Sequence, residues 1–171
     1  TGAMGTLELV SGFISQNWMR GTTGKWRQDP ALSGGGQAYD SGAHPLSTLT
    51  WTVESDVDTV FAFVDNHGTP VDINSAISVK FTNGVMANMT ISGNCPGNGS
   101  FMVFVFDGGR VEFDGWGAGW IRVYGTDGKE VEDPAIEGTK IDPATNFVEA
   151  ILGSAEPRTT PQNGIVHSEL M

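Results

Sequence analysis

The chain reads Val79-Lys80-Phe81-Thr82-Asn83-Gly84-Val85-Met86-Ala87-Asn88-Met89-Thr90-Ile91 near its middle. Apolar and polar residues alternate on both sides of Asn83-Gly84, which is the pattern of two strands with one covered face each. Both turn residues accept the positive φ angles that a two-residue hairpin needs. This stretch therefore predicts two antiparallel strands joined by a tight turn.

Two more hairpins follow along the chain. One is expected around Gly108-Gly109 and the other around Thr126-Asp127-Gly128, each between short runs of β-forming residues. Consecutive hairpins produce antiparallel sheets. Residues 57–131 therefore predict a large, mainly antiparallel sheet.

The residues before this region predict a strand, a loop and a helix. Residues 6–16 alternate, with Leu7 and Leu9 expected on the covered face of a strand. Residues 17–28 are rich in Gly and Thr and indicate a loop. Apolar residues then recur every three or four positions over residues 36–53, the period of a helix.

The predicted fold class is α+β, an open, mainly antiparallel sheet with helices on one face. Besides the helix at 36–53, residues 142–152 and 161–170 have helical periodicity. Pro45 falls inside the first helix, where proline removes a backbone hydrogen bond. We therefore expect a local kink beside His44.

Asp40 and His44 are candidate functional residues. They are four positions apart in the predicted helix, so they share one face. A carboxylate can orient an imidazole, and an imidazole can move a proton near neutral pH. The same spacing also occurs in pairs that only stabilise a fold, and the residues alone leave both interpretations open.

The composition excludes some classes of partner and favours others. With 171 residues, 39% hydrophobic and 17% charged, the chain predicts one globular domain. Its net charge of −11 repels phosphate backbones and anionic lipids, so nucleic-acid and membrane partners are not expected. No apolar run has the length of a membrane span.

Cysteine and histidine are too few to predict a metal site. The chain has one cysteine, Cys95, and three histidines, and none of them are at metal-ligand spacing. An internal disulfide is excluded, which favours a cytoplasmic location.

Two stretches combine aromatic residues with polar or flexible neighbours. Lys25, Trp26 and Arg27 suit the rim of a polar ligand site, or equally the anchoring of a loop to its own domain. Trp116 and Trp120 lie in a Gly-rich stretch that suits a turn in which two indoles pack. An aromatic platform for a sugar ring is the alternative.

The sheet itself predicts self-association. In residues 101–106 and 57–64 both alternating sets of side chains are apolar. The predicted helices cover one face only, so an apolar face is expected to remain, and a homo-oligomer through that face would cover it. Alternatively, residues 94–100 and the Trp116–Trp120 stretch fold over it.

Several motifs appear in order along the chain. Trp26-Arg27-Gln28-Asp29-Pro30-Ala31-Leu32-Ser33-Gly34-Gly35-Gly36 precedes Asp40-x-Gly42-x-His44. Later come Val71-Asp72-Ile73, Phe81-x-Asn83-Gly84, Asn146-Phe147-Val148-x-Ala150-Ile151 and Pro161-x-Asn163-Gly164. Together they resemble the Gfo/Idh/MocA oxidoreductases, the family of glucose–fructose oxidoreductase and inositol dehydrogenase.

The resemblance implies a Rossmann domain that binds NAD(P), followed by a domain on an open antiparallel sheet that often forms the oligomer interface. We expect this chain, residues 1–171, to be that second domain alone, because it has no Gly-x-Gly-x-x-Gly turn and no Glu-Lys-Pro motif. NAD or NADP is then expected in the full-length parent and no cofactor in this fragment.

The resemblance also assigns roles at the site. It implies a sugar or polyol substrate, with His44 as the acid/base and Asp40 as its orienter or as an acceptor for a substrate hydroxyl. Arg27, Trp26 and Lys25 become candidates for substrate binding. Ser47 stands where the family often has Asp, so one polar contact to the substrate differs.

Three functions remain open from the sequence. The chain is the substrate and oligomerisation domain of an NAD(P)-dependent dehydrogenase, the same part of an NAD-dependent glycosidase, or a non-catalytic dimerising or sugar-binding module. The isolated fragment is expected to be inactive, and a dimer and a tetramer are equally compatible with the residues.

Overall fold

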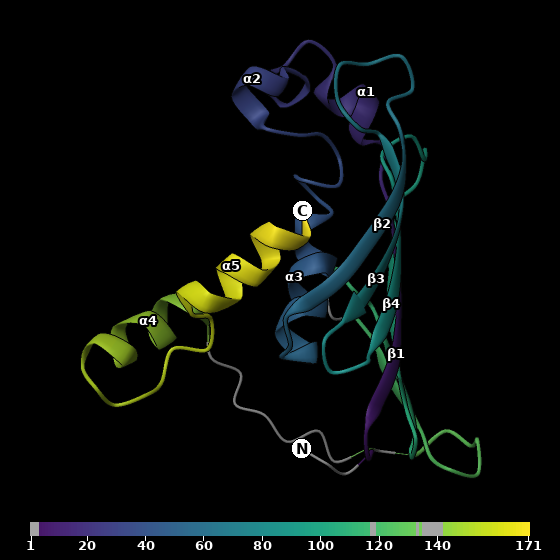
Figure 1. Ribbon diagram of the computed structural model, residues 1–171, viewed down its shortest axis with the longest axis vertical. Coiled ribbons are helices and arrows are strands. Elements are labelled where there is room, and N and C mark those ends of the chain that lie inside the picture. The colour runs from purple at the N-terminus through teal and green to yellow at the C-terminus, as the bar shows by residue number, and fades with distance from the viewer. Residues whose placement is uncertain (1–3, 117–118, 133, 135–141) are drawn as a thin grey trace.

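The computed structural model describes residues 4–116, 119–132, 134 and 142–171. They form one seven-stranded sheet with helices packed on one side (Figure 1). The strands are β1 (Leu7–Ser15), β2 (Val57–Asp65), β3 (Asn74–Phe81), β4 (Met86–Ser92), β5 (Gly99–Phe106), β6 (Gly109–Phe113) and β7 (Ile121–Tyr124). The helices are α1 (Trp18–Thr22), the 3-10 turn η1 (Trp26–Gln28), α2 (Pro30–Ser33), α3 (Ala43–Val53), α4 (Pro143–Ile151) and α5 (Pro161–Leu170).

The hairpin at Asn83-Gly84 is confirmed. Strands β3 and β4 pair antiparallel as far as Lys80 and Met86, and Gly84 has a positive φ of 91°, a conformation that glycine adopts without strain. The second hairpin is also present, but its turn is Asp107-Gly108, because Phe106 pairs with Gly109. The predicted turn was therefore one residue too late.

Strand β1 lies in the middle of the sheet. The strand order is β2-β3-β4-β1-β5-β6-β7, and β1 pairs parallel with β4 and antiparallel with β5. The predicted antiparallel sheet thus consists of two antiparallel groups on either side of β1. The sheet remains open and mainly antiparallel, as predicted.

The prediction of which face of β1 is covered was right for Leu7, which packs against the core, and wrong for Leu9. Val10 and Ile14 are buried and Leu9 is exposed, and the pairing with β5 shifts register between Leu7 and Leu9. Because β1 is a central strand, its covered face is set by the side on which α3 packs, not by its own alternation.

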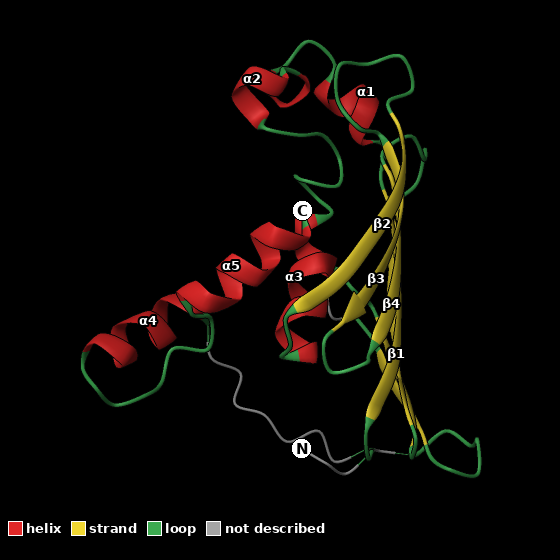
Figure 2. Ribbon diagram, viewed as in Figure 1, coloured by secondary structure: helices red, strands yellow, loops and turns green. Residues whose placement is uncertain are grey.

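The core lies between the sheet and helices α3 and α5 (Figure 2). Leu46, Leu49 and Val53 of α3 pack with Leu170 of α5 against β1, β3, β4 and β5. Placement of the helices on one face is therefore confirmed. Among the described helices, none combines the length and apolar content that a membrane crossing needs.

Helix α3 begins later than the periodicity predicted. The helix starts at Ala43, and residues 37–42 form turns instead. Pro45 lies in the first turn of α3, where the backbone N–H groups have no intrahelical partner in any case. The expected loss of a helical hydrogen bond at Pro45, and the kink that it implied, are therefore corrected.

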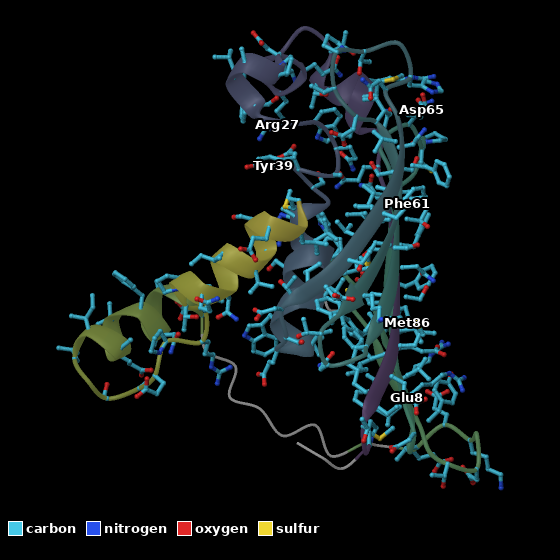
Figure 3. The ribbon with its side chains drawn as sticks, viewed as in Figure 1. Glu8, Arg27, Tyr39, Phe61, Asp65 and Met86 are labelled. Atoms are coloured by element: carbon cyan, nitrogen blue, oxygen red, sulfur yellow. The ribbon has the colours of Figure 1, made fainter. Side chains whose placement is uncertain are left out.

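The opposite face of the sheet has no helix over it in the described part of the chain. Figure 3 shows Phe61 and Met86 pointing away from the side on which α3 lies. Phe63, on the same strand and face as Phe61, is 72% exposed. Polar residues such as Ser78 and Asn88 lie between these apolar side chains. This surface, defined by Phe61, Phe63 and Met86, is called the bare face below.

Candidate functional site

The candidate residues gather at one edge of the sheet. Strands β1 and β6 both end there, β5 begins there, and α3 starts beside them. The segments that follow β1 and β6 and the turn before α3 therefore meet in space. This edge is at the top of Figure 1, near α1 and α2.

Asp40 is held by two side chains from the segment after β1. Its Oδ2 accepts hydrogen bonds from Trp18 Nε1 at 2.7 Å and from Arg27 Nε at 3.0 Å. The Asp40 side chain is 37% exposed and that of Arg27 39% exposed, so the ion pair remains in contact with solvent. A carboxylate with two fixed donors keeps one orientation, and no described residue donates a hydrogen bond to the other oxygen of Asp40, Oδ1.

The Gly-rich turn positions the backbone of Asp40. The Asp72 carboxylate accepts hydrogen bonds from the backbone N–H groups of Gly36 at 2.6 Å and Ala38 at 2.7 Å. A Cβ on Gly36 would lie 2.0 Å from the Asp72 carbonyl oxygen, so only glycine fits. Asp40 N then donates to Gly36 O at 2.9 Å, which continues the turn towards α3.

The segment at residues 17–28 is not the loop that its composition predicted. It forms α1 and η1, and the Trp18 side chain is buried. Gln28 Nε2 donates to Met19 O at 2.7 Å and to Thr22 Oγ1 at 2.9 Å, which ties the two short helices together. Trp18 is therefore a buried hydrogen-bond donor to Asp40.

His44 and Asp40 are not hydrogen-bonded to each other in the described structure. His44 is exposed at the start of α3, and its ring meets Trp116 edge-on with 4.9 Å between centroids. No described residue forms a hydrogen bond to either ring nitrogen of His44. Asp40 and His44 therefore lie at the same end of the sheet, but each contacts different residues.

Of the three predicted rim residues, two line a cavity with Asp40. Lys25 and Arg27 border a space of about 380 Å³ that also contains Asp40 and Trp18. Lys25 Nζ donates to Gly21 O at 2.7 Å. Trp26 is exposed and stacks under the Arg27 guanidinium, 4.5 Å from ring centroid to Cζ, so it supports Arg27.

Sequence reasoning missed the polar residues that line this edge. Gln16 and Asn98 border the Asp40 cavity and also a second cavity that contains Trp116 and Trp120. In the structure Gln16 directly follows β1 and Asn98 directly precedes β5, whereas the predicted strands covered residues 6–16 and began at residue 101, so their bounds did not single out either residue. No group of three His, Cys, Asp or Glu side chains in the described residues could hold a metal ion.

The sequence profile of the GFO/IDH/MocA C-terminal domain matches residues 1–130. This chain belongs to that family. The match includes the Gly-rich turn, Asp40, His44 and the sheet as far as β7. Comparison with curated protein sequences finds no match.

Solved structures show the same fold. The aldose-aldose oxidoreductase from Caulobacter crescentus in complex with glycerol has a TM-score of 0.76 at 21% identity, over 99% of this chain and 52% of that one. The WlbA dehydrogenase from Bordetella pertussis, in complex with NADH and UDP-GlcNAcA, has a TM-score of 0.71 at 17% identity, over 97% and 51%.

An NAD-binding protein from Listeria innocua is similar at a TM-score of 0.75 and 21% identity, over 98% of this chain and 51% of that one. The chain therefore spans about half the length of the solved structures that it matches. At these identities, the structural similarity establishes the fold alone.

Proposed function

We propose that this chain is the substrate-binding side of an NAD(P)-dependent oxidoreductase that oxidises a carbinol of a sugar or polyol. One observation carries the proposal. A half-exposed carboxylate, Asp40, is fixed by Trp18 and Arg27 at a cavity, and His44 stands on the adjacent helix with both ring nitrogens free of partners in the described chain. A fixed acceptor and an unengaged imidazole are the parts that removal of a hydroxyl proton requires.

In this mechanism His44 takes the hydroxyl proton at a ring nitrogen while the carbon of the carbinol loses hydride. NAD(P), when bound, supplies the acceptor for that hydride. Asp40 accepts a hydrogen bond from a substrate hydroxyl through its free oxygen, and Arg27 keeps the carboxylate in place. Lys25 and Arg27 also give the cavity positive charge, which favours the alkoxide character that develops during proton loss.

The cofactor is proposed to be held outside these residues. In dinucleotide-binding folds a Gly-rich turn follows the first strand, whereas here β1 is followed by Gln16-Asn17-Trp18. The Asp40 cavity opens beside that segment. The similar structures are about twice as long as this chain, which leaves room for such a domain in them. A lone free cysteine, Cys95, fits a cytoplasmic enzyme of this kind.

The test uses the full-length gene product with NAD⁺ or NADP⁺ and a panel of sugars and cyclic polyols. Formation of NAD(P)H in step with substrate oxidation is expected. Release of the aglycone from a nitrophenyl glycoside, without net NAD(P)H, would instead support the glycosidase function. Turnover of neither class would contradict an enzymatic role and favour a non-catalytic module.

We also propose that the chain forms a homodimer through the bare face. On the bare face the rings of Phe61 and Phe63 meet edge-on and are exposed, as is Met86, and a symmetric pair of such faces is the most common way to cover exposed apolar side chains. The predicted alternative was coverage of this face by residues 94–100 and the Trp116–Trp120 stretch; of these residues, Trp116 contacts His44 on the helix side.

Sedimentation equilibrium measures this directly. The chain has a mass of 18.1 kDa, and twice that mass is expected at micromolar concentration. Phe63→Glu should return the chain to a monomer. The matched control is Leu152→Glu at the C-cap of α4, a residue that is 74% exposed; α4 itself lies on the helix side of the sheet, away from the bare face (Figure 1). Dissociation by the α4 change alone, or a monomeric wild type, would contradict the proposal.

A further inference from the structure

A cavity of about 640 Å³ lies between α3, α5 and the loop that joins α4 to α5. Its volume is in the range of small-molecule sites. Its wall on α3 begins at Ser47 and reaches Trp51, which follows His44 by two helical turns, about 10 Å along the helix axis. This cavity and the Asp40 cavity have no lining residue in common. A ligand here would therefore occupy a separate site.

The loop before α5 is held firmly at this cavity. The side chain of Asn146, which is buried in α4, donates to Glu156 O at 3.0 Å and accepts a hydrogen bond from Arg158 N at 2.9 Å. Trp51 Nε1 donates to Arg158 O at 2.9 Å. Both backbone polar groups of Arg158 are thus engaged, so its side chain starts from a fixed point on the cavity wall. A site that is fixed before binding saves the cost of ordering it.

The charge of this wall is unusual for so acidic a chain. The sequence has 20 Asp and Glu but only 9 Lys and Arg, yet Arg158 lines this cavity and no carboxylate does. Among the described residues the ion pairs involve other cations, so Arg158 has no carboxylate partner there. Four other cavities each contain an aspartate, namely Asp114, Asp40, Asp65 and Asp72. An unpaired guanidinium at a cavity free of carboxylates favours an anionic ligand.

Uncharged polar groups border the same space. The side chains of Ser47 and Thr159 line it and form no hydrogen bond within the described chain. His167 also lines it, and His167 Nδ1 is buried without a partner there. Burial lowers the pKa of His167, so its ring is neutral near neutral pH and has one donor and one acceptor nitrogen. Arg158 is therefore the permanent charge of this cavity, with hydroxyl donors beside it.

The apolar part of the wall is an indole. Trp51 is 47% exposed, and its only polar atom is already bonded to the backbone of Arg158. A single exposed tryptophan is ordinary, but this one borders a cavity together with the arginine that it binds. An anionic contact and a ring contact are thus available side by side.

We propose that the cavity between α3 and α5 binds a small organic anion in which a carboxylate or phosphate group is attached to a flat ring. The guanidinium fork of Arg158 binds the anionic oxygens, the hydroxyls of Ser47 and Thr159 donate to them, and Trp51 packs on the ring. The site is independent of the proposed oxidation, because none of these residues lines the Asp40 cavity.

The experiment follows the indole N–H and histidine ring signals of the 171-residue chain by NMR during titration. Phenyl phosphate and benzoate are the two probes, and the tighter one identifies the anionic group. Saturable shifts are expected for Trp51 and His167, and none for Trp26, Trp120 or His67, which serve as internal controls. Benzyl alcohol is a ring without charge and inorganic phosphate a charge without a ring, so each should bind about tenfold more weakly or worse.

Variants complete the test. Arg158→Ala is expected to weaken binding about 10- to 150-fold, while the backbone groups that bind Trp51 and Asn146 remain. Arg158→Lys keeps the charge without the fork and should lie in between. The matched control is Arg20→Ala, an exposed arginine on α1, which should bind as the wild type does. Circular dichroism reports whether each variant folds.

Three results would overturn the proposal. The first is no saturable shift at Trp51 and His167 with either probe. The second is an affinity for benzyl alcohol equal to that for phenyl phosphate and benzoate, which would mark an apolar cavity. The third is unchanged affinity in a folded Arg158→Ala variant.

Discussion

Two Asp–His pairs of this chain differ in a way that separates a structural pair from a candidate catalytic one. In the loop after β2, His67 Nδ1 lies 3.2 Å from Asp65 Oδ2, and Asn94 Nδ2 lies 2.9 Å from His67 Nε2. Both ring nitrogens of His67 are engaged. At the other pair, Asp40 binds Trp18 and Arg27, and among the described residues the His44 ring contacts the Trp116 ring without a hydrogen bond to either nitrogen.

A direct hydrogen bond is therefore not what marks a site. The Asp65–His67 pair meets the simplest geometric criterion, yet its nitrogens have fixed partners and no capacity left to accept a proton from a ligand. His44 retains that capacity, and the carboxylate near it is held by other donors beside a cavity. An imidazole whose nitrogens have no described hydrogen-bond partner, near a cavity, distinguishes the two pairs better than the distance between Asp and His does.

Among the aspartates, the largest effect on this comparison is expected from Asp40→Asn in the full-length gene product. Loss of the charge weakens the hydrogen bonds from Trp18 and Arg27 and the contact to substrate. Hydrogen bonds to charged groups contribute about 1.5–3 kcal/mol, so kcat/KM should fall about 10- to 150-fold. Asp65→Asn is the matched control and should leave kcat/KM unchanged. Similar losses in both variants would remove the distinction.

A third aspartate sharpens the comparison through stability. Asp72 is bonded to the backbone N–H groups of Gly36 and Ala38, so Asp72→Asn should lower the free energy of unfolding by about 1.5–3 kcal/mol. Asp40→Asn, whose partners are half-exposed side chains, should cost less. Urea unfolding measures both. A larger loss for Asp40→Asn would make Asp40 the structural residue.

The third histidine predicts a smaller, pH-dependent effect. Burial lowers the pKa of His167, so below the ordinary histidine value near 6.5 the unfolded chain binds more protons than the folded one. The free energy of unfolding should therefore be highest above that pH and fall as the pH drops towards the folded-state pKa. Urea midpoints across this window should decline less in His167→Gln. If the urea midpoint declines equally in His167→Gln and in the wild type, the pH dependence is due to other titratable groups.

The smallest effect is expected at Asp65. Hydrogen bonds from the backbone and side chain of His67 lower the pKa of this exposed carboxyl. A carboxyl whose pKa is lowered in the folded state stabilises the fold at pH values above its unfolded-state pKa near 3.9. This stabilisation is lost as the pH falls through the folded-state pKa. Acid titration of unfolding should thus be slightly shallower in Asp65→Asn than in the wild type. A steeper acid loss in Asp65→Asn would contradict this.

Sequence patterns predicted the fold correctly where the structure of a segment depends mainly on its own residues. Asn83-Gly84 specifies its hairpin through its own backbone preferences, and the apolar period of α4 specifies a helix. Nothing local in Leu7–Ser15 indicates a place between β4 and β5, because that position depends on pairing with strands far along the chain.

The same limit applies to the candidate site. Asp40, His44, Arg27, Trp26 and Lys25 were predicted as site residues, and the structure brings them to the same end of the sheet; their roles stay predictions. Their partners were not predicted, since Trp18 is 22 residues from Asp40 and lies in a segment that composition suggested was a loop. The contact between His44 and Trp116 joins α3 to the segment that follows β6, 72 residues later in the chain, and the periodicity of a sequence does not predict such a long-range contact.

The most direct test of the account is the steady-state rate of His44→Gln in the full-length gene product, beside His67→Gln. Loss of a general acid–base is expected to reduce kcat by about 10²–10⁴-fold with little change in KM, while His67→Gln retains the wild-type kcat. A His44→Gln enzyme that folds and keeps the wild-type kcat would contradict the central claim that His44 takes the substrate proton.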